Sequence, residues 1–328
     1  MDKRQFLQTA GAAAAACMAT PALWAAGSYP QRPIRLLVPF QAGSSPDTWG
    51  RAIGSILSTR LGQPVVVENM PGAGGTIGTV ALKRAAPDGY TLGLLANTQA
   101  ITVHTFQTPP YDLTADFVAV ASIGGGASLL TVPATSPIRT AKDLIAALKA
   151  KPGELAYGSG GNGSIAHLAT EQLLSDAGAT ALHVPYRGAP DIITSQLSGQ
   201  TQFGMPILGS SMLFVRSGKL RPLAISSEKR SAFLPGVPTL AEALPPGFTL
   251  SSWSGFFAPA RTPAPIVDRL HSEIRAILRS NQLDELAHSM GSDIQPMDSP
   301  AQFQQFVNAE DKRFAAQIKN IGLKVDGR

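Results

Sequence analysis

Short apolar stretches, each followed by a glycine-rich turn and then by a helical pattern, recur along this chain. In the first unit, apolar residues 34–40 precede a turn at residues 41–47 and a helix, capped by Ser45, with Trp49 and Ile53 on one face. Strand–loop–helix units in series predict a parallel sheet with helices on its faces. The pattern restarts at residues 129–132 without a Pro/Gly-rich linker. We therefore expect an α/β protein of two lobes joined by strands.

The restart of this pattern predicts the lobe boundaries. The chain leaves the first unit near residues 128–132 and returns near residues 224–227. We therefore expect residues 28–128 plus 228–328 to form lobe 1 and residues 129–227 to form lobe 2. Each lobe is expected to be a mostly parallel sheet flanked by helices.

The first 27 residues have the pattern of a secretory signal peptide. A Lys-Arg pair at residues 3–4 precedes an apolar stretch at 11–19, and small residues follow at 21–27. Cleavage is expected after residue 27, with Ala26 as the competing end, and the Lys-Arg pair fits both the general secretory and the twin-arginine route. No later stretch approaches the roughly 18 uninterrupted apolar residues of a membrane span. We therefore expect the protein to be free in the periplasm.

The composition excludes several classes of protein. Of the 328 residues, 44% are hydrophobic and 15% are charged, and the single cysteine, Cys17, lies in the expected leader. These values do not fit a coiled coil, an acidic disordered protein or a disulfide-stabilised miniprotein. The formal net charge is +5, and no run of basic residues is interleaved with aromatic ones. We therefore expect no nucleic-acid partner.

Motifs of catalysis and metal binding do not occur in this sequence. Ser45 and Ser164 lack the paired glycines of a nucleophile elbow, and the five histidines have no metal-ligand spacing. Residues 72–78 have isoleucine where a dinucleotide fingerprint needs its third glycine. His167 follows Ser164 by three residues, so a hydrolytic pair on one helix face is the alternative to a packed histidine. We expect no metal, no cofactor and no enzymatic activity.

Two loops have the features of an anion-binding site. Residues 41–47 and 158–164 each follow a strand, carry small residues and open a helix. Such turns direct free backbone N–H groups and the positive end of the helix toward one point. Two of them in different lobes can hold one carboxylate-bearing molecule, and the alternative is that both are ordinary α/β turns.

Seven segments, taken together, are more specific than either loop. They are residues 29–40 (YPQRPIRLLVPF), 69–75 (NMPGAGG), 86–91 (APDGYT), 157–168 (YGSGGNGSIAHL), 183–188 (HVPYRG), 234–239 (LPGVPT) and 252–259 (SWSGFFAP). In this order, across essentially the whole mature chain, they resemble the tripartite tricarboxylate transporter receptors, the Bug family of periplasmic solute-binding proteins. The resemblance implies a two-lobed periplasmic-binding-protein (Venus flytrap, type II) fold. It also implies that backbone N–H groups and small hydroxyls of the two loops hold a ligand carboxylate in the cleft.

The candidate ligand-binding residues come from the two loops, from the residues after an expected strand at 90–95 and from the turn at 186–188. They are Phe40, Gly43, Ser44, Ser45, Asp47, Asn97, Thr98, Ser159, Gly160, Gly161, Asn162, Gly163, Ser164, His167, Tyr186, Arg187 and Gly188. For Asp47 a helix-end role is favoured over ligand contact, and for Arg187 a surface position is the alternative to a cleft position.

The first loop and one wall of the expected cleft depart from the family pattern. Residues 40–47 read FQAGSSPD, without the two prolines, the second glycine and the threonine of the usual FPPGGSTD, and Pro46 removes a backbone N–H. After Gln200 the family commonly has a Phe-Asp-Asn segment, and this chain has Met-Pro-Ile at residues 205–207. The wall is therefore more apolar, which favours an aromatic or otherwise bulky carboxylate.

The resemblance implies a periplasmic receptor that captures a carboxylate and delivers it to a tripartite tricarboxylate-type membrane transporter. Its expected partners are the small-molecule ligand and the membrane subunits of that transporter, and the receptor is expected to be a monomer. Two alternatives are a ligand-sensing receptor of a signalling system and, with less support, a secreted hydrolase. The sequence leaves the carboxylate open among dicarboxylates, tricarboxylates, amino acids and aromatic acids.

Overall fold

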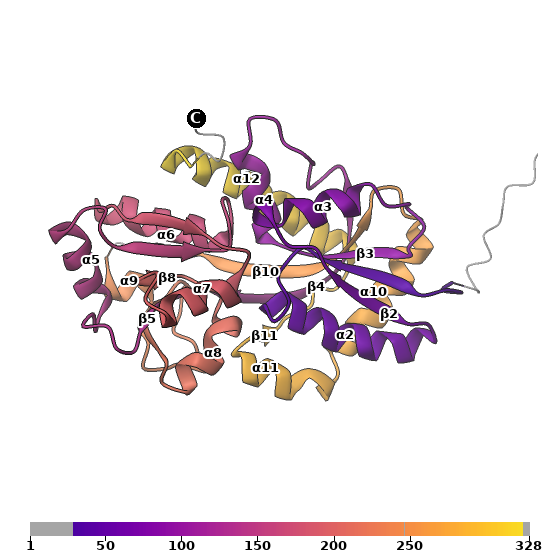
Figure 1. The fold of residues 1–328 in the computed structure, drawn as a ribbon. Coiled ribbons are helices and arrows are strands. Elements are labelled where there is room, and N and C mark those ends of the chain that lie inside the picture. Colours follow the sequence, from indigo (N-terminus) through magenta and orange to yellow (C-terminus); the bar gives the residue numbers. More distant parts are fainter. Residues whose placement is uncertain (1–28, 246, 324–328) are drawn as a thin grey trace, which may run out of the picture.

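Two β-sheets, one in each lobe, form the frame of the molecule (Figure 1). The computed structural model describes residues 29–245 and 247–323, so the expected signal peptide at residues 1–27 lies outside the described residues. The strands are β1 (Ile34–Val38), β2 (Val65–Asn69), β3 (Thr91–Ala96), β4 (Phe117–Ala127), β5 (Leu129–Pro133), β6 (Ala156–Ser159), β7 (Leu182–Pro185), β8 (Phe203–Gly204), β9 (Leu220–Ile225), β10 (Ser251–Pro259) and β11 (Asp293–Ile294). The first sheet has the order β11-β4-β10-β3-β1-β2 and the second the order β7-β6-β8-β5-β9.

Helices cover both sheets. They are α2 (Ser45–Leu61), α3 (Thr76–Lys83), α4 (Asn97–Thr102), α5 (Ala141–Ala150), α6 (Ile165–Ala177), α7 (Ala189–Leu197), α8 (Leu208–Arg216), α9 (Leu240–Ala243), α10 (Ala264–Leu278), α11 (Asp284–Met290) and α12 (Pro300–Ile321). In the first lobe α2 and α10 lie on one face of the sheet, and α3, α4 and α12 lie on the other (Figure 1). Within the described part of the chain, no helix combines the length and the hydropathy that crossing a membrane requires.

The two sheets mix parallel and antiparallel strands. In the first, β1 pairs in parallel with β2 and β3, while β10 runs antiparallel to β3 and β4. In the second, β6 pairs in parallel with β7 and β8, while β5 runs antiparallel to β8 and β9. Parallel pairing belongs to the strand–loop–helix units, and the strands near the passage between lobes run antiparallel. The expected two-lobed α/β fold is confirmed, with mixed sheets rather than mostly parallel ones.

The start of α2 lies one residue away from the predicted cap. Ser44, not Ser45, holds the N-cap position with extended backbone angles (φ −74°, ψ 162°), and its side chain makes no capping hydrogen bond. Pro46 and Asp47 lie in the first turn as predicted, and Gly62 ends the helix in the left-handed conformation (φ 67°). The hydroxyl of Ser44 therefore has no role within its own helix.

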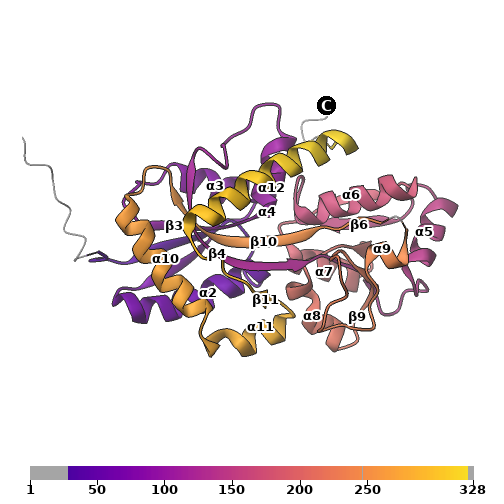
Figure 2. The ribbon, with the colours of Figure 1, turned by 180° about the vertical axis from the view of Figure 1, so that it is seen from behind.

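The hydrophobic core lies on both faces of the first sheet and continues into the second lobe. Trp49 of α2 and Leu270 of α10 belong to the cluster on one face. Phe303 of α12 belongs to the cluster on the other face, which extends to the strands of the second sheet. Figure 2 shows α12 running along β10 toward α6, where Gln317 donates a hydrogen bond to Gln172 at 3.2 Å. A helix that packs on the first sheet thus reaches the second lobe.

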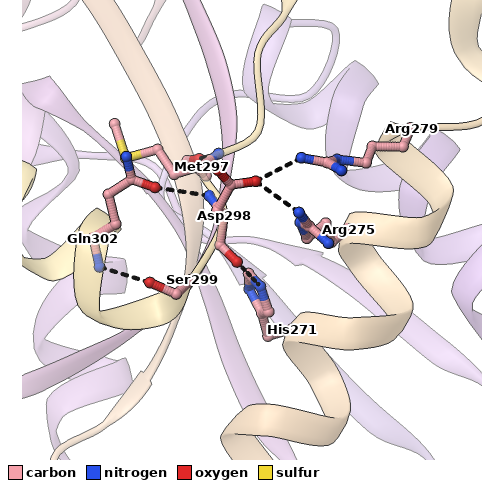
Figure 3. Close-up of polar contacts among 8 residues, drawn as sticks. His271, Arg275, Arg279, Met297, Asp298, Ser299 and Gln302 are labelled. Atoms are coloured by element: carbon pink, nitrogen blue, oxygen red, sulfur yellow. Dashed lines mark hydrogen bonds and ion pairs between the residues drawn. The ribbon is translucent and has the colours of Figure 1, made fainter.

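The connection between β11 and α12 is held against α10 by Asp298 (Figure 3). Its carboxylate accepts hydrogen bonds from Arg275 and Arg279, both at 2.6 Å, and its backbone carbonyl lies 3.2 Å from Nε2 of His271. The hydrogen bond from Arg275 and the positive charges of both arginines hold the pKa of Asp298 below its usual range. Ser299 then caps α12 with its side chain, so the helix begins at a fixed place on the first lobe.

The chain segments around Ser128, Ser226 and Leu250 are hydrogen-bonded to one another. The N–H of Ser128, between β4 and β5, donates to Oγ of Ser226 at 2.9 Å, and the N–H of Ser226 donates to the carbonyl of Ser128 at 2.9 Å. Oγ of Ser226 also donates to the carbonyl of Leu250 at 2.6 Å. Ile225 forms a bridge with Thr239, so the chain after residue 227 still contacts the second sheet. The lobe boundaries drawn from the sequence stay a prediction.

Candidate functional site

A cavity of about 110 Å³ lies between the lobes. Its lining from the lobe of the first sheet consists of Pro39, Phe40, Ser44, Ser45, Pro46, Trp49, Gly74, Gly75, Ala96, Asn97, Thr98, Ile123, Gly124, Gly125, Gly126, Ser252, Trp253, Ser254 and Ser292. Its lining from the other lobe consists of Gly160, Ser164, Ile165, Ala166, Arg187, Gly188, Ala189, Ile192, Pro206, Ile207 and Ser210. This volume is several times that of a single water site, which suits a small organic molecule.

Four helices of nine or more residues begin at this cavity. The first residues or N-caps of α2, α6, α7 and α8 all belong to its lining. The N–H groups in the first turn of a helix have no partners within the helix, and the helix dipole adds partial positive charge there. Several helix starts around one cavity therefore create an environment that favours an anion.

The hydroxyl of Ser44 is buried in the cavity wall without a partner. Ser44 is 3% exposed, and its Oγ has no hydrogen bond to any described residue. The next residue is already engaged, because the N–H of Ser45 donates to Oγ of Ser210 in the other lobe at 3.0 Å. An unsatisfied buried polar group costs about 1–3 kcal/mol. A ligand oxygen at this position would offset that cost.

The loop at residues 158–164 is held in shape by its own hydrogen bonds. Oγ of Ser159 accepts from the N–H of Gly161 at 3.1 Å and lies 2.6 Å from Nε2 of His183. Gly161 has a positive φ of 105°, which glycine adopts without strain. Oγ of Ser164 accepts a first-turn N–H and so caps α6. The loop thereby places Gly160 and Ser164 at the cavity.

Two stacked histidines support this loop. The rings of His167 and His183 lie 4.0 Å apart at an interplanar angle of 9°, and the N–H of Gly163 donates to Nδ1 of His167 at 3.1 Å. Burial and the neighbouring His183 lower the pKa of His167 to about 3, and burial lowers the pKa of His183 to about 4. Oγ of Ser164 accepts the backbone N–H of His167. Because Nδ1 of His167 accepts an N–H, the neutral ring carries its proton on Nε2 and has no free lone pair to act as a base toward Ser164.

Arg187 is the one charged residue in the described lining of the cavity. It is exposed, lies in the turn between β7 and α7, and takes part in no ion pair of the described chain. A Cβ added at Gly160 would lie 3.7 Å from Cα of Gly188, so this turn adjoins the second loop. A guanidinium group there can donate two parallel hydrogen bonds to a carboxylate.

Asp47 organises the first loop and does not line the cavity. Its carboxylate accepts hydrogen bonds from the N–H of Gly43 at 2.9 Å and from Nδ2 of Asn69 at 2.8 Å, and it pairs with Arg51 at 2.9 Å. Burial raises the pKa of Asp47, but the hydrogen bonds from Gly43, Arg51 and Asn69 outweigh it and hold the pKa below its usual range. The carboxylate thus fixes the loop that carries Ser44.

Replacing Asp47 with asparagine is expected to destabilise the fold by about 1–3 kcal/mol at pH 7, because buried hydrogen bonds to a charged group are lost. The lowered pKa keeps the folded carboxylate charged, so the difference from the wild type should shrink as pH falls through that pKa. Urea unfolding at pH 7 and pH 3 measures this, with the exposed Asp268→Asn of α10 as control. Equal stability of wild type and variant at pH 7 would contradict the structural role.

The structure brings some of the predicted site residues to the cavity and places the others behind it. Those that line it are Phe40, Ser44, Ser45, Asn97, Thr98, Gly160, Ser164, Arg187 and Gly188. Those outside its lining are Gly43, Asp47, Ser159, Gly161, Asn162, Gly163, His167 and Tyr186. Several of the second group hold the loops that carry the first. Ligand binding by either group stays a prediction.

Sequence reasoning missed the wall formed by β4 and β10. Trp253 and the three glycines at residues 124–126 line the cavity from these strands, as Trp49 does from α2, and none of them was among the candidates. Three consecutive glycines inside a strand are unusual and indicate a close approach of the backbone, which was the available signal. Pro206 and Ile207 do line the cavity, so the apolar wall expected from the sequence is present.

Hydrogen bonds join the two lobes around the cavity. They run from Gln41 Nε2 to Asp191 Oδ1 at 2.9 Å, from Ser45 N to Ser210 Oγ at 3.0 Å, and from Thr102 Oγ1 to the carbonyl of Gly163 at 3.0 Å. The structure therefore shows the lobes in contact on the cavity side.

A family model described as the tripartite tricarboxylate transporter family receptor matches residues 50–323. The chain belongs to this family. The resemblance seen in the sequence is thereby confirmed, and the receptor family also accounts for the two mixed sheets flanked by helices.

Relatives of this receptor include Bug proteins and solved structures with bound acids. Protein BugT of Bordetella pertussis is 35% identical over 98% of this chain and 96% of its own length. The structure of R. palustris Rpa4515 with adipate has a TM-score of 0.86 at 32% identity and covers 90% of this chain and 99% of its own. MatC from Rhodopseudomonas palustris with bound malate has a TM-score of 0.83 at 27% identity, covering 88% and 100%. The chain is a receptor of the Bug family type.

Proposed function

We propose that the protein is a periplasmic receptor that captures an organic acid between its lobes and delivers it to a tripartite tricarboxylate-type membrane transporter. One observation carries the proposal: several helix starts, the unpartnered hydroxyl of Ser44 and the guanidinium of Arg187 share one cavity whose described lining has no acidic side chain. Such a lining favours an anion over a cation. The relatives with adipate and malate support an organic acid, and the family supports a transporter as the receiving partner.

The expected affinity follows from the contacts that the cavity offers. Hydrogen bonds to a charged group contribute about 1.5–3 kcal/mol each, so four of them supply roughly 6–12 kcal/mol before costs. Loss of translational and rotational freedom consumes several kcal/mol of this. A net binding free energy of about 8 kcal/mol corresponds to a dissociation constant of about 1 μM.

The proposed function has no catalytic step. Ser164 and His167 support this, because each is engaged with the backbone in holding the second loop. In this role the receptor acts in the periplasm as a monomer and needs no cofactor. Its two macromolecular contacts are the export machinery and the membrane subunits of the transporter.

A thermal-shift comparison of organic acids with their own amides tests the proposal. The mature protein is unfolded and refolded to remove any bound molecule and then heated with benzoate or benzamide, and with succinate or succinamide. A bound acid at 100 times its dissociation constant stabilises the folded state by ~2.7 kcal/mol, which raises the melting temperature by several degrees. The amides should leave it unchanged. Equal shifts with acid and amide, or no shift across a broad panel of acids, would overturn carboxylate recognition.

Delivery to a transporter is tested in cells. Deleting the gene should abolish uptake of the radiolabelled acid that gives the largest thermal shift, and the plasmid-borne gene should restore it. Unchanged uptake in the deletion strain would overturn the transport role and favour the signalling alternative.

A further inference from the structure

A full positive charge is present at only one place in the described cavity lining. Arg187 lies beside the starts of α6 and α7, which approach each other where Gly160 adjoins Gly188. The loop before α2 reaches the same place, since a Cβ added at Gly43 would lie 4.0 Å from Cγ of Pro190. The free hydroxyl of Ser44 belongs to this loop. A single ligand carboxylate bound beside Arg187 would therefore have its negative charge balanced.

The wall formed by β4 and β10 offers no second cation. Gly124, Gly125 and Gly126 pair with Ser254, Trp253 and Ser252, so three glycines in a row present backbone without side chains. The indole N–H of this buried Trp253 side chain donates to Oε2 of Glu310 at 3.2 Å, so it is already engaged and is not free to bind a ligand. The serine hydroxyls can hydrogen-bond a neutral substituent, but they carry no charge to balance a second carboxylate.

We propose that the ligand is a monocarboxylate with an apolar body, its carboxylate at the Arg187 end and its body against Trp253, Ile207 and the three glycines. This inference rests on the proposed function and narrows its ligand class. A second carboxylate on the body would be buried without a cation, and burying an unpaired charge is strongly unfavourable. The preference therefore differs from the dicarboxylates, adipate and malate, seen with the two relatives.

Matched pairs of acids test the preference. Calorimetry at pH 7 compares benzoate with terephthalate and hexanoate with adipate, each pair having one body and one or two carboxylates. We expect the monoacid of at least one pair to bind about tenfold or more tightly than its diacid. Equal or tighter binding of the diacid in both pairs would overturn the inference while leaving the proposed function intact. Absence of binding by all four acids and by the wider panel would overturn the proposed function itself.

A second cation on the apolar wall provides the complementary test. Ile207→Lys places an ammonium group in the cavity lining, and we expect it to strengthen diacid binding about tenfold and to leave monoacid binding less affected. Leu213→Lys, in the helix α8 that begins directly after Ile207 but 71% exposed and outside the lining, makes the same charge change as a control. Equal effects of the two variants on diacid binding would contradict the placement of the body.

A steric variant keeps the test decisive if Ile207→Lys does not fold. A Cβ added at Gly126 would meet only Oγ of Ser252, at 3.4 Å, so Gly126→Ala is accommodated by the fold and fills part of the wall. We expect it to weaken binding of the preferred monoacid several-fold without lowering the melting temperature of the free protein. Unchanged affinity in Gly126→Ala would contradict contact between the ligand body and this wall.

Discussion

Replacing Arg187 with glutamine is expected to weaken binding of the best organic acid by about 10- to 100-fold. Arg187 is the single charged residue of the described cavity lining, and a charge-assisted hydrogen bond contributes about 1.5–3 kcal/mol. Each 1.4 kcal/mol corresponds to a factor of ten in affinity. Glutamine retains a hydrogen-bond donor but loses the charge and the two parallel hydrogen bonds of a guanidinium group. Lysine restores only the charge, so Arg187→Lys should bind with an affinity between those of Arg187→Gln and the wild type.

The control for this variant is a charge change away from the cavity. Arg139 is exposed in the turn before α5 and does not line the cavity, so Arg139→Gln should bind like the wild type. Calorimetry gives the affinities, and thermal unfolding of the free proteins shows that neither variant is damaged. If Arg187→Gln binds as tightly as Arg139→Gln, Arg187 is a surface charge and the carboxylate is held by helix starts and hydroxyls alone.

The free energy of unfolding is expected to fall as pH is lowered from 7 toward 4, because two histidines are kept neutral in the fold. In the unfolded chain a histidine has a pKa of about 6.5, while burial lowers the pKa of His167 to about 3 and that of His183 to about 4. Between these values the unfolded chain binds protons that the folded protein does not, so acid favours unfolding. At pH 5, His167 alone should cost about 2 kcal/mol relative to pH 7. Urea unfolding at a series of pH values measures this slope.

His167→Asn separates this effect from the other titrating groups. Asparagine keeps an acceptor for the N–H of Gly163 but does not titrate, so the loss of stability between pH 7 and pH 5 should be smaller in this variant. His288→Asn, on α11 and outside the histidine stack, should keep the slope of the wild type. The same slope in all three proteins would show that His167 is protonated in the fold at pH 5.

The features that could be predicted from the sequence are those whose physical causes lie within a few residues of them. The loops before α2 and α6 were predicted because their causes lie within a few residues: small residues after a strand, a serine before a helix and a glycine at its end. Helix α4 was missed because all six of its residues are buried, which removes the amphipathic pattern that reveals a surface helix. The glycine-rich end of β4 was missed because it is held as a strand by pairing with β10 and β11, which are far away in sequence.

For the same reason, the sequence predicted only the polar side of the candidate site. Ser44 and Ser164 could be named from the loops, since a helix start is an anion site in its own right. The contacts of Asp47 with Asn69 and Arg51, and the position of Trp253 in the cavity wall, depend on how the sheet brings distant segments together. Periodicity does not contain that information. The charge of Arg187 was evident from the sequence, but whether it faced the cleft or the solvent was not.

The hydrogen bonds that bridge the lobes bear on how long a captured molecule stays. The pairs Gln41–Asp191 and Thr102–Gly163 join residues that do not line the cavity, yet both must break when the lobes part. At about 0.5–1.5 kcal/mol each, these hydrogen bonds slow the opening of the lobes. They therefore slow both the release of a bound ligand and the entry of a new one into the closed protein. Residence time can therefore evolve at positions that never touch the cargo. Equilibrium selectivity, set by the cavity lining, can remain as it was.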